Sequence, residues 1–262
     1  MKIIDCFGFY NELDLLYYRL KLLYDVVDVF VICESTKTFA GNDKELFYEN
    51  NKSRYQEFES KIVHIINDEL ISDPKYAWYN ENHQRNYLNV GIQKLNLSDD
   101  DQICISDLDE IPDPLILGYF KYCNKQFDHV ACLEMDYYYF NLTTKCSIEW
   151  VGFVIQSYRY YKEIGCSPQK LRMELPRQPA IVGRGGWHLS YFGDPTFVSN
   201  KIQQFAHQEY NYKQFTNIDL IEKRIQGRQD LYGRQDYIFE NIPIEKNTYL
   251  PPNYDIYLTN YC

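Results

Sequence analysis

The sequence predicts an α/β fold in which a mixed, mostly parallel sheet is flanked by helices. Its first half alternates short apolar runs with longer runs whose apolar residues recur every three or four positions, as strands and crossover helices do. At 262 residues the chain is long enough for one large domain, and no internal repeat or low-complexity linker divides it. We therefore expect a single domain over residues 1–262.

The expected elements of the first half follow in order. Asn11 is the expected cap of the first helix, because a polar side chain there precedes leucines with helical spacing. Strands are expected at residues 2–9, 26–33, 61–66 and 102–106, helices at 12–23, 54–59 and 80–95, and a loop at 34–50.

The second half opens with a clear helix start. Asp113 is placed to cap a helix and Pro114 to occupy its first position, so a helix should run to about residue 123. Strands are expected at residues 129–140 and 150–161, a stretch punctuated by Gly and Pro up to residue 186, and helices at 199–210 and 218–225.

Charge and cysteine usage exclude several classes of protein. The formal net charge is −10 and no polybasic run occurs, which argues against nucleic acid or an anionic membrane as a partner. The chain shows neither a signal peptide nor a transmembrane segment. Cys6, Cys33 and Cys104 lie within apolar runs, as reduced thiols do. We expect a soluble, cytoplasmic protein, and the sequence does not predict its oligomeric state.

The sharpest local feature is an acidic cluster directly after an apolar strand. Asp107, Asp109 and Glu110 stand where an open α/β sheet collects its ligands, at the carboxyl end of a strand. Carboxylates this close repel one another unless a cation lies between them, and Mn²⁺ or Mg²⁺ suits such a site together with substrate phosphates. An aspartyl-phosphate phosphatase would carry this motif after its first strand, and a two-metal nuclease would need more carboxylates and a basic surface.

Four blocks of the sequence resemble glycosyltransferase family 17. They are Asn11 to Leu16 with Arg19 and Leu20, Asp25 to Asp28 running into Val31 to Ser35, Asp107 to Pro112, and Gly186 to Ser190. The blocks occur in the order of that family, and the resemblance extends to about residue 230.

The resemblance implies a GT-A-like nucleotide-sugar-binding fold, with a donor-binding half to residue 125 and an acceptor-binding half over 126–262. It also implies inverting transfer of a sugar, most often N-acetylglucosamine, from a UDP-sugar donor with a divalent metal to a glycan or glycoprotein acceptor. Because the chain starts at its first strand, without the anchor of vertebrate members, we expect an enzyme of a bacterium or a large DNA virus.

The resemblance also assigns roles to residues. The expected metal ligands are Asp107, Asp109 and His188. The expected donor-binding residues are Phe9, Asn11, Glu12, Glu34, Arg85, Asp107 and Arg228.

The catalytic base is the least constrained role. It needs a carboxylate or imidazole that takes the proton of the acceptor hydroxyl. Glu110 is expected first because it adjoins the metal pair, Asp136 second, and Glu174, Asp194 and Glu209 remain open.

A purely structural role for one candidate residue and two other functions also remain open. His188, between Trp187 and Leu189, could equally be a core histidine. The alternative functions are a non-catalytic glycan-binding module on the same fold and a UDP-sugar hydrolase.

Overall fold

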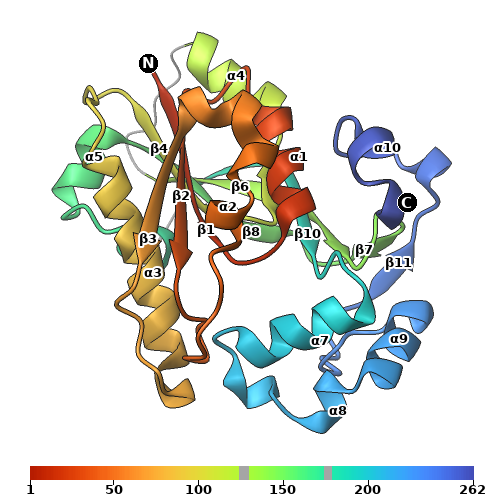
Figure 1. Cartoon of the computed structure of the whole chain (residues 1–262). Helices are drawn as coiled ribbons and strands as arrows, with labels where there is room; N and C mark the ends of the chain where they lie inside the picture. The colour runs from red at the N-terminus through yellow and green to blue at the C-terminus, as the bar shows by residue number, and fades with distance from the viewer. Residues whose placement is uncertain (124–129, 174–178) are drawn as a thin grey trace.

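The computed structural model describes residues 1–123, 130–173 and 179–262 (Figure 1). Within these residues eleven strands form one mixed sheet flanked by helices, which confirms the predicted α/β class. The strands are β1 (Ile3–Phe9), β2 (Val29–Ser35), β3 (Ile62–Asn67), β4 (Gln102–Asp107), β5 (Glu110–Pro112), β6 (Ala131–Tyr139), β7 (Thr144–Cys146), β8 (Trp150–Ser157), β9 (Ala180–Val182), β10 (Gly186–Ser190) and β11 (Phe239–Asn241).

The first four strands form a parallel ladder in the order β3-β2-β1-β4. Parallel neighbours need long crossover connections. The helix Leu13–Leu23 lies in the connection from β1 to β2, and the helix Ala77–Ile92 lies in the connection from β3 to β4. The second half of the chain continues the sheet through antiparallel pairs, with β8 against β4 and β6 against β8. β10 then runs parallel to β6 and antiparallel to β5, which brings the strand after the acidic cluster beside the strand that carries His188.

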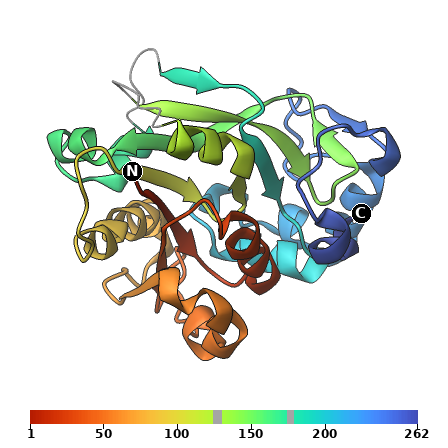
Figure 2. The same ribbon diagram turned by 90° about the horizontal axis from the view of Figure 1, so that it is seen from above.

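Helices cover both faces of the sheet (Figures 1 and 2). Ile3 and Phe7 of β1 pack in one apolar core with residues of α1 and α4, while Ile4 and Cys6 pack in a second core with residues of α3, α5 and α6. The helices are α1 (Leu13–Leu23), α2 (Phe47–Asn50), α3 (Ala77–Ile92), α4 (Pro114–Tyr122), α5 (Tyr158–Glu163), α6 (Pro168–Met173), α7 (Pro195–Gln204), α8 (Lys213–Thr216), α9 (Ile218–Gly227) and α10 (Tyr254–Tyr257).

A third apolar cluster joins α7 and α9 to the end of β6. Val198 and Ile202 of α7 pack with Ile221 of α9 and with Tyr139. In Figure 1 these helices lie below the carboxyl ends of β1 and β2. The cluster therefore holds a group of helices opposite the edge where the parallel strands end.

Several expected boundaries need correction. Asn11 does not cap α1, because Glu12 occupies the cap position and makes no side-chain cap hydrogen bond. The expected strand over residues 150–161 stops at Ser157, whose hydroxyl accepts from the backbone N–H of Tyr160 and starts α5. The expected loop at 34–50 contains the end of β2 and all of α2, and α6 was not expected at all. Asp113 does cap α4, accepting from the N–H of Leu115 at 2.8 Å.

Other boundaries are close to expectation. The expected short helix at 54–59 is a 3₁₀ helix, Lys52–Lys61, and α7 begins and ends several residues before the expected 199–210. The expected start of a strand at His129 lies outside the described residues.

Candidate active site

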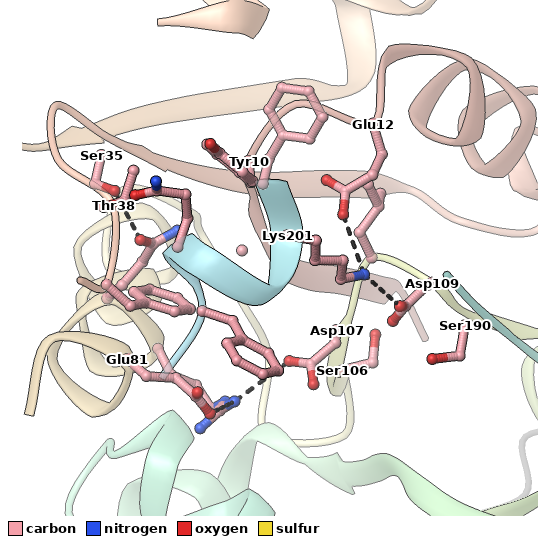
Figure 3. A pocket seen from close by; sticks show the side chains of 18 of the residues that line it. Tyr10, Glu12, Ser35, Thr38, Glu81, Ser106, Asp107, Asp109, Ser190 and Lys201 are labelled. Carbon is pink, nitrogen blue, oxygen red and sulfur yellow. Dashed lines mark hydrogen bonds and ion pairs between the residues drawn. The ribbon is translucent and has the colours of Figure 1, made fainter. Parts of the chain in front are cut away.

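A pocket of about 260 Å³ opens at the carboxyl ends of β1, β2 and β4 (Figure 3). β1 comes first in the chain but lies between β2 and β4, so the chain leaves it towards one side of the sheet and later returns to the other. Open α/β sheets bind ligands in the crevice at such a switch point. Lys201, Gln204 and Phe205 add a wall from α7 and the residue that follows it.

The acidic turn, residues 107–110, brings two carboxylates to the pocket wall. One oxygen of Asp107 lies 3.3 Å from Nη2 of Arg85, and the other lies 2.9 Å from Nη2 of Arg172. Oδ2 of Asp109 lies 3.0 Å from Nζ of Lys201. Each carboxylate faces a cation, which allows both to stay ionised at close range.

Lys201 and Asp109 each shift the pKa of the other. Burial would raise the pKa of Asp109, but Lys201 and then His188 outweigh it and hold that pKa below its usual range. Burial would lower the pKa of Lys201, but Asp109 and then Glu12 outweigh it and raise that pKa. Nζ of Lys201 also lies 3.3 Å from Oε1 of Glu12, so one ammonium joins the turns after β1 and β4 (Figure 3).

His188 forms part of the pocket wall and points one ring nitrogen at the acidic turn. Its ring stacks on Tyr137, with centroids 4.7 Å apart, and contacts Trp150 at 4.4 Å. Nε2 lies 3.6 Å from Oδ1 of Asp109, and Nδ1 is buried without a hydrogen-bond partner among the described residues. The stacking holds the imidazole in place beside Asp109.

Arg19 of α1 binds the backbone of the acidic turn from the protein interior. Its side chain is fully buried and pairs with Asp5 of β1 at 2.7 Å. Nη1 donates to the carbonyl oxygens of Asp107, Leu108 and Glu110 at 2.9, 3.0 and 2.8 Å. Three acceptors on one donor group fix the backbone of the turn, and with it the direction of both aspartates.

The structure places six of the expected site residues on the pocket wall. Donor-binding and metal-binding candidates meet there because β1, β4 and β10 lie close together in one sheet. The six are Phe9, Glu12, Arg85, Asp107, Asp109 and His188.

The two residues expected as catalytic bases do not line this pocket. The carboxylate of Glu110 is fully buried and accepts from both Nη atoms of Arg172, at 2.7 and 2.6 Å, and from Nε1 of Trp150 at 2.6 Å. Asp136 lies on β6 and pairs with Lys145 at 2.9 Å. Glu110 therefore has no surface that a substrate could reach, and it anchors the acidic turn instead.

Three expected donor-binding residues also lie off the pocket wall. Glu34 is fully buried and turned towards α2, where it accepts from the N–H of Tyr48 at 3.0 Å. Asn11 lies between two lining residues but does not itself line the pocket. Arg228 follows α9 and lines a second cavity.

The remaining base candidates have other surroundings. Asp194 caps α7, accepting from the N–H of Phe197 at 2.7 Å. Glu209 lies 2.6 Å from Nδ1 of His207 on the surface. Glu174 lies outside the described residues.

Sequence reasoning missed Arg172, Lys201 and the structural role of Arg19. Arg19 had a signal, because it falls on the face of α1 that Leu16, Leu20 and Leu23 line, where a charge needs a buried partner. Lys201 and Arg172 had none, because only the packing of α6 and α7 against the sheet edge brings them to the acidic turn.

The residues present suit a cation that is shared with a ligand. Among the described residues, no cluster of three or more His, Cys, Asp or Glu side chains could hold a metal alone. Mg²⁺ and Mn²⁺ commonly use one or two carboxylates together with substrate phosphates, however. Asp109 and Nε2 of His188 offer two such ligands on one wall, and Asp107 lines the same wall with its oxygens paired to Arg85 and Arg172.

Comparison with known families decides the classification. The model of glycosyltransferase family 17 matches residues 1–256, nearly the whole chain. The chain belongs to glycosyltransferase family 17. The resemblance inferred from four short blocks of sequence is therefore confirmed at the level of the family.

Curated relatives match part of the family 17 chain. A β-1,4-mannosyl-glycoprotein 4-β-N-acetylglucosaminyltransferase from Rattus norvegicus is 31% identical over 116 residues, and so is the one from Homo sapiens. Each match covers 42% of this chain and 22% of the relative, so the chain matches about a fifth of the relatives' length.

A solved structure with a weak similarity is 4-diphosphocytidyl-2C-methyl-D-erythritol synthase from Anaerococcus prevotii. It has a TM-score of 0.40 and 9% identity, and the match covers 75% of this chain and 95% of that chain. Within the described part of the family 17 chain, no helix is long and apolar enough to cross a membrane.

Proposed function

We propose that this chain transfers N-acetylglucosamine from a UDP-sugar to a hydroxyl of a glycan acceptor, with inversion and with a divalent metal. One observation carries the proposal: the acidic turn and its cations lie at the switch point of the sheet, in the crevice that nucleotide ligands favour. Family membership and the names of the curated relatives support the choice of sugar.

Asp107, Asp109 and His188 are the residues that would hold the metal. When bound, Mn²⁺ or Mg²⁺ supplies positive charge that neutralises the diphosphate of the donor. The chain adds its own cations beside them, since Arg85 and Lys201 line the same pocket within 3.3 Å of the two aspartates. Fixed cations aimed at a leaving diphosphate stabilise the charge that develops as the sugar departs.

Aromatic side chains give the pocket a surface for flat and ringed groups. Tyr10 directly follows β1, where the uracil ring would stack, and Trp150, Tyr191 and Phe205 line other parts of the wall, while the ring of Phe9 is buried in the core. Glu12 takes the role first expected of Glu110, acceptance of the proton from the sugar hydroxyl, because Glu12 lines the pocket and Glu110 does not.

The test is release of UDP from a panel of UDP- and GDP-sugars, each assayed with Mn²⁺ or with EDTA and with or without mannose-containing glycans. We expect release from UDP-N-acetylglucosamine that needs Mn²⁺ and rises with acceptor. Asp109→Asn should lower kcat/KM by about a hundredfold, as loss of a group that stabilises the transition state does. Asp219→Asn, an exposed change on α9, is the matched control and should leave the rate unchanged.

Other outcomes would replace the proposal. Release that no acceptor stimulates, with free sugar as the product, would make the chain a UDP-sugar hydrolase. Folded protein that binds glycans and turns over no donor would make it a binding module.

A further inference from the structure

A second cavity of about 420 Å³ lies beside α9 and shares none of its described lining residues with the active-site pocket. We call it the arginine cavity, after Arg224, Arg228 and Arg234 on its wall. Residues of α8, α9 and the segment that follows them line it, in the group of helices at the lower right of Figure 1.

The charge of this cavity is opposite to that of the molecule. The chain as a whole carries a formal charge of −10, yet the wall of the cavity has three arginines and one acidic residue, Asp230. Arg234 is committed to that aspartate, at 2.6 Å, and Arg224 donates to the carbonyl oxygen of Gln214 at 2.8 Å. An excess of positive charge therefore remains on the wall.

Arg224 keeps its charge because its carbonyl partner is neutral, and the second uncompensated charge belongs to Arg228. Its side chain is exposed, and in the described part of the chain it makes no hydrogen bond or ion pair. It also ends α9 with a φ of +50°, a left-handed backbone conformation that favours glycine. A long basic side chain at a position where glycine would be easier is consistent with use of its guanidinium by a ligand.

Aromatic rings complete the wall. The cavity is lined by Phe215, Tyr232, Tyr237 and Phe239. The guanidinium of Arg234 covers one face of Tyr237, 3.5 Å from its ring centroid. Tyr210 stacks on Tyr232 with centroids 4.0 Å apart, so contact with a sugar falls to the ring surface that these neighbours leave open. Flat aromatic surfaces bind sugar rings by apolar contact, and the forked donors of arginine bind carboxylate or phosphate oxygens in pairs. Together they suit a sugar that carries an acidic group.

The two cavities share one wall. The hydroxyl of Tyr191, which lines the active-site pocket, lies 2.6 Å from the hydroxyl of Tyr232, which lines the arginine cavity. That wall separates the two cavities by a short distance, so a glycan of several sugars has the reach to set its accepting end in the pocket and a further unit in the arginine cavity.

We propose that the arginine cavity is an acceptor subsite that binds an acidic sugar unit, one that carries a carboxylate or a phosphate. This inference rests on the proposed glycosyl transfer in one respect, namely that the bound sugar belongs to the acceptor of that reaction. Binding of the acidic sugar itself needs neither UDP nor metal.

The test is calorimetric titration of the purified full chain with D-glucuronate, glucose 6-phosphate, inorganic phosphate and neutral D-glucose. We expect both acidic sugars to bind more tightly than glucose and than inorganic phosphate. Arg228→Gln should weaken their binding by about tenfold or more, the value of a charge-assisted hydrogen bond. Arg228→Lys should keep part of the affinity, and Lys223→Gln, an exposed change one turn earlier on α9, should bind like wild type.

Three results would overturn the inference. One is binding of Arg228→Gln that equals wild type. Another is glucose that binds as tightly as glucuronate, since the acidic group would then contribute nothing. The third is inorganic phosphate that binds as tightly as glucose 6-phosphate, since the sugar ring would then contribute nothing. Asp109→Asn should still bind glucuronate, so failure of this subsite and failure of the proposed transfer show up in different assays.

Discussion

Two buried arginines decide the shape of the acidic turn. Arg19 reaches it from α1 and donates to three of its carbonyl groups, while Arg172 reaches it from α6 and pairs with the carboxylates of Asp107 and Glu110. The backbone that carries the two aspartates is therefore fixed by charges behind the pocket wall, while Arg85 and Lys201 hold their carboxylates from within the pocket.

Variants of Arg19 and Asp5 should distinguish the effect of Arg19 on folding stability from its effect on UDP binding. Arg19→Met leaves the carboxylate of Asp5 buried without its partner, so the free energy of unfolding should fall by about 3–5 kcal/mol. The double variant Asp5→Leu/Arg19→Met buries no lone charge and should regain part of that stability, although the carbonyl oxygens that Arg19 served stay without a donor. Its binding of UDP should stay weak, because the carbonyl groups of the turn still lack their donor. Urea denaturation and titration with UDP measure the two effects, and a double variant that binds UDP like wild type would contradict this role.

Glu110→Gln tests whether this residue is an anchor or a catalytic base. The change removes one partner of a fully buried ion pair, so the free energy of unfolding in urea should fall by about 3 kcal/mol. Turnover at a temperature where the variant stays folded should remain within about tenfold of wild type, because the carboxylate does not face the pocket. Unchanged stability together with abolished turnover would restore Glu110 as the base.

At the scale of elements, α7 carries Lys201 to the pocket and depends on one cap. Asp194→Ala removes the side chain that accepts from the N–H of Phe197, and the free energy of unfolding should fall by about 1 kcal/mol. Asp194→Asn is the matched control, since asparagine caps helices about as well and has no charge. Thermal and urea denaturation measure the difference. If Asp194→Asn keeps its stability but loses turnover, Asp194 is a catalytic base after all.

The sequence was informative about elements wherever apolar periodicity was strong. β1, α1, β4 and α4 fall within one or two residues of expectation, since each has a clear run or a clear cap. β10 escaped prediction, because a five-residue strand is decided by its pairing with β5 and β6 rather than by its own pattern. α6 escaped because Gly and Pro around it suggested a loop.

The candidate site follows the same rule. Phe9, Asp107 and Asp109 were predictable, because residues that follow parallel strands meet at one edge of a sheet. The inward turn of Glu34 and Glu110 was not, because which carboxylate faces the pocket depends on the partners that packing provides. Those partners are Arg172 for Glu110 and the backbone of α2 for Glu34.

At the scale of the whole molecule, buried thiols and phenols predict a loss of stability in alkali. Burial raises the pKa of Cys6, Cys33 and Cys104, and likewise that of Tyr139. The folded state therefore keeps these protons at a pH where the unfolded chain releases them. The stabilising effect of the thiols is complete below their unfolded pKa of about 8.5 and that of Tyr139 below its unfolded pKa of about 10, and each is lost as the pH rises above that value.

Urea denaturation at several pH values measures this effect. The free energy of unfolding should fall by about 3 kcal/mol or more between pH 8.5 and pH 10, since each such group contributes up to about 1.4 kcal/mol per pH unit. Cys33→Ala should show a shallower fall than wild type, and a flat profile would contradict the burial of these groups.

This acidic molecule gathers cations in two cavities. Arg85 and Lys201 line the active-site pocket, and Arg224, Arg228 and Arg234 line the arginine cavity, in a chain whose formal charge is −10. In the proposed function, the acidic turn holds the diphosphate of a UDP-sugar together with a divalent cation.

Titration of the wild-type chain and of Asp109→Asn with UDP, in Mn²⁺ and then in EDTA, measures this binding. Mn²⁺ should strengthen UDP binding to the wild-type chain by about tenfold or more, and Asp109→Asn should abolish the difference. UDP binding that is equally tight in EDTA, or equally strengthened by Mn²⁺ in Asp109→Asn, would show that the acidic turn does not hold a metal and a diphosphate together.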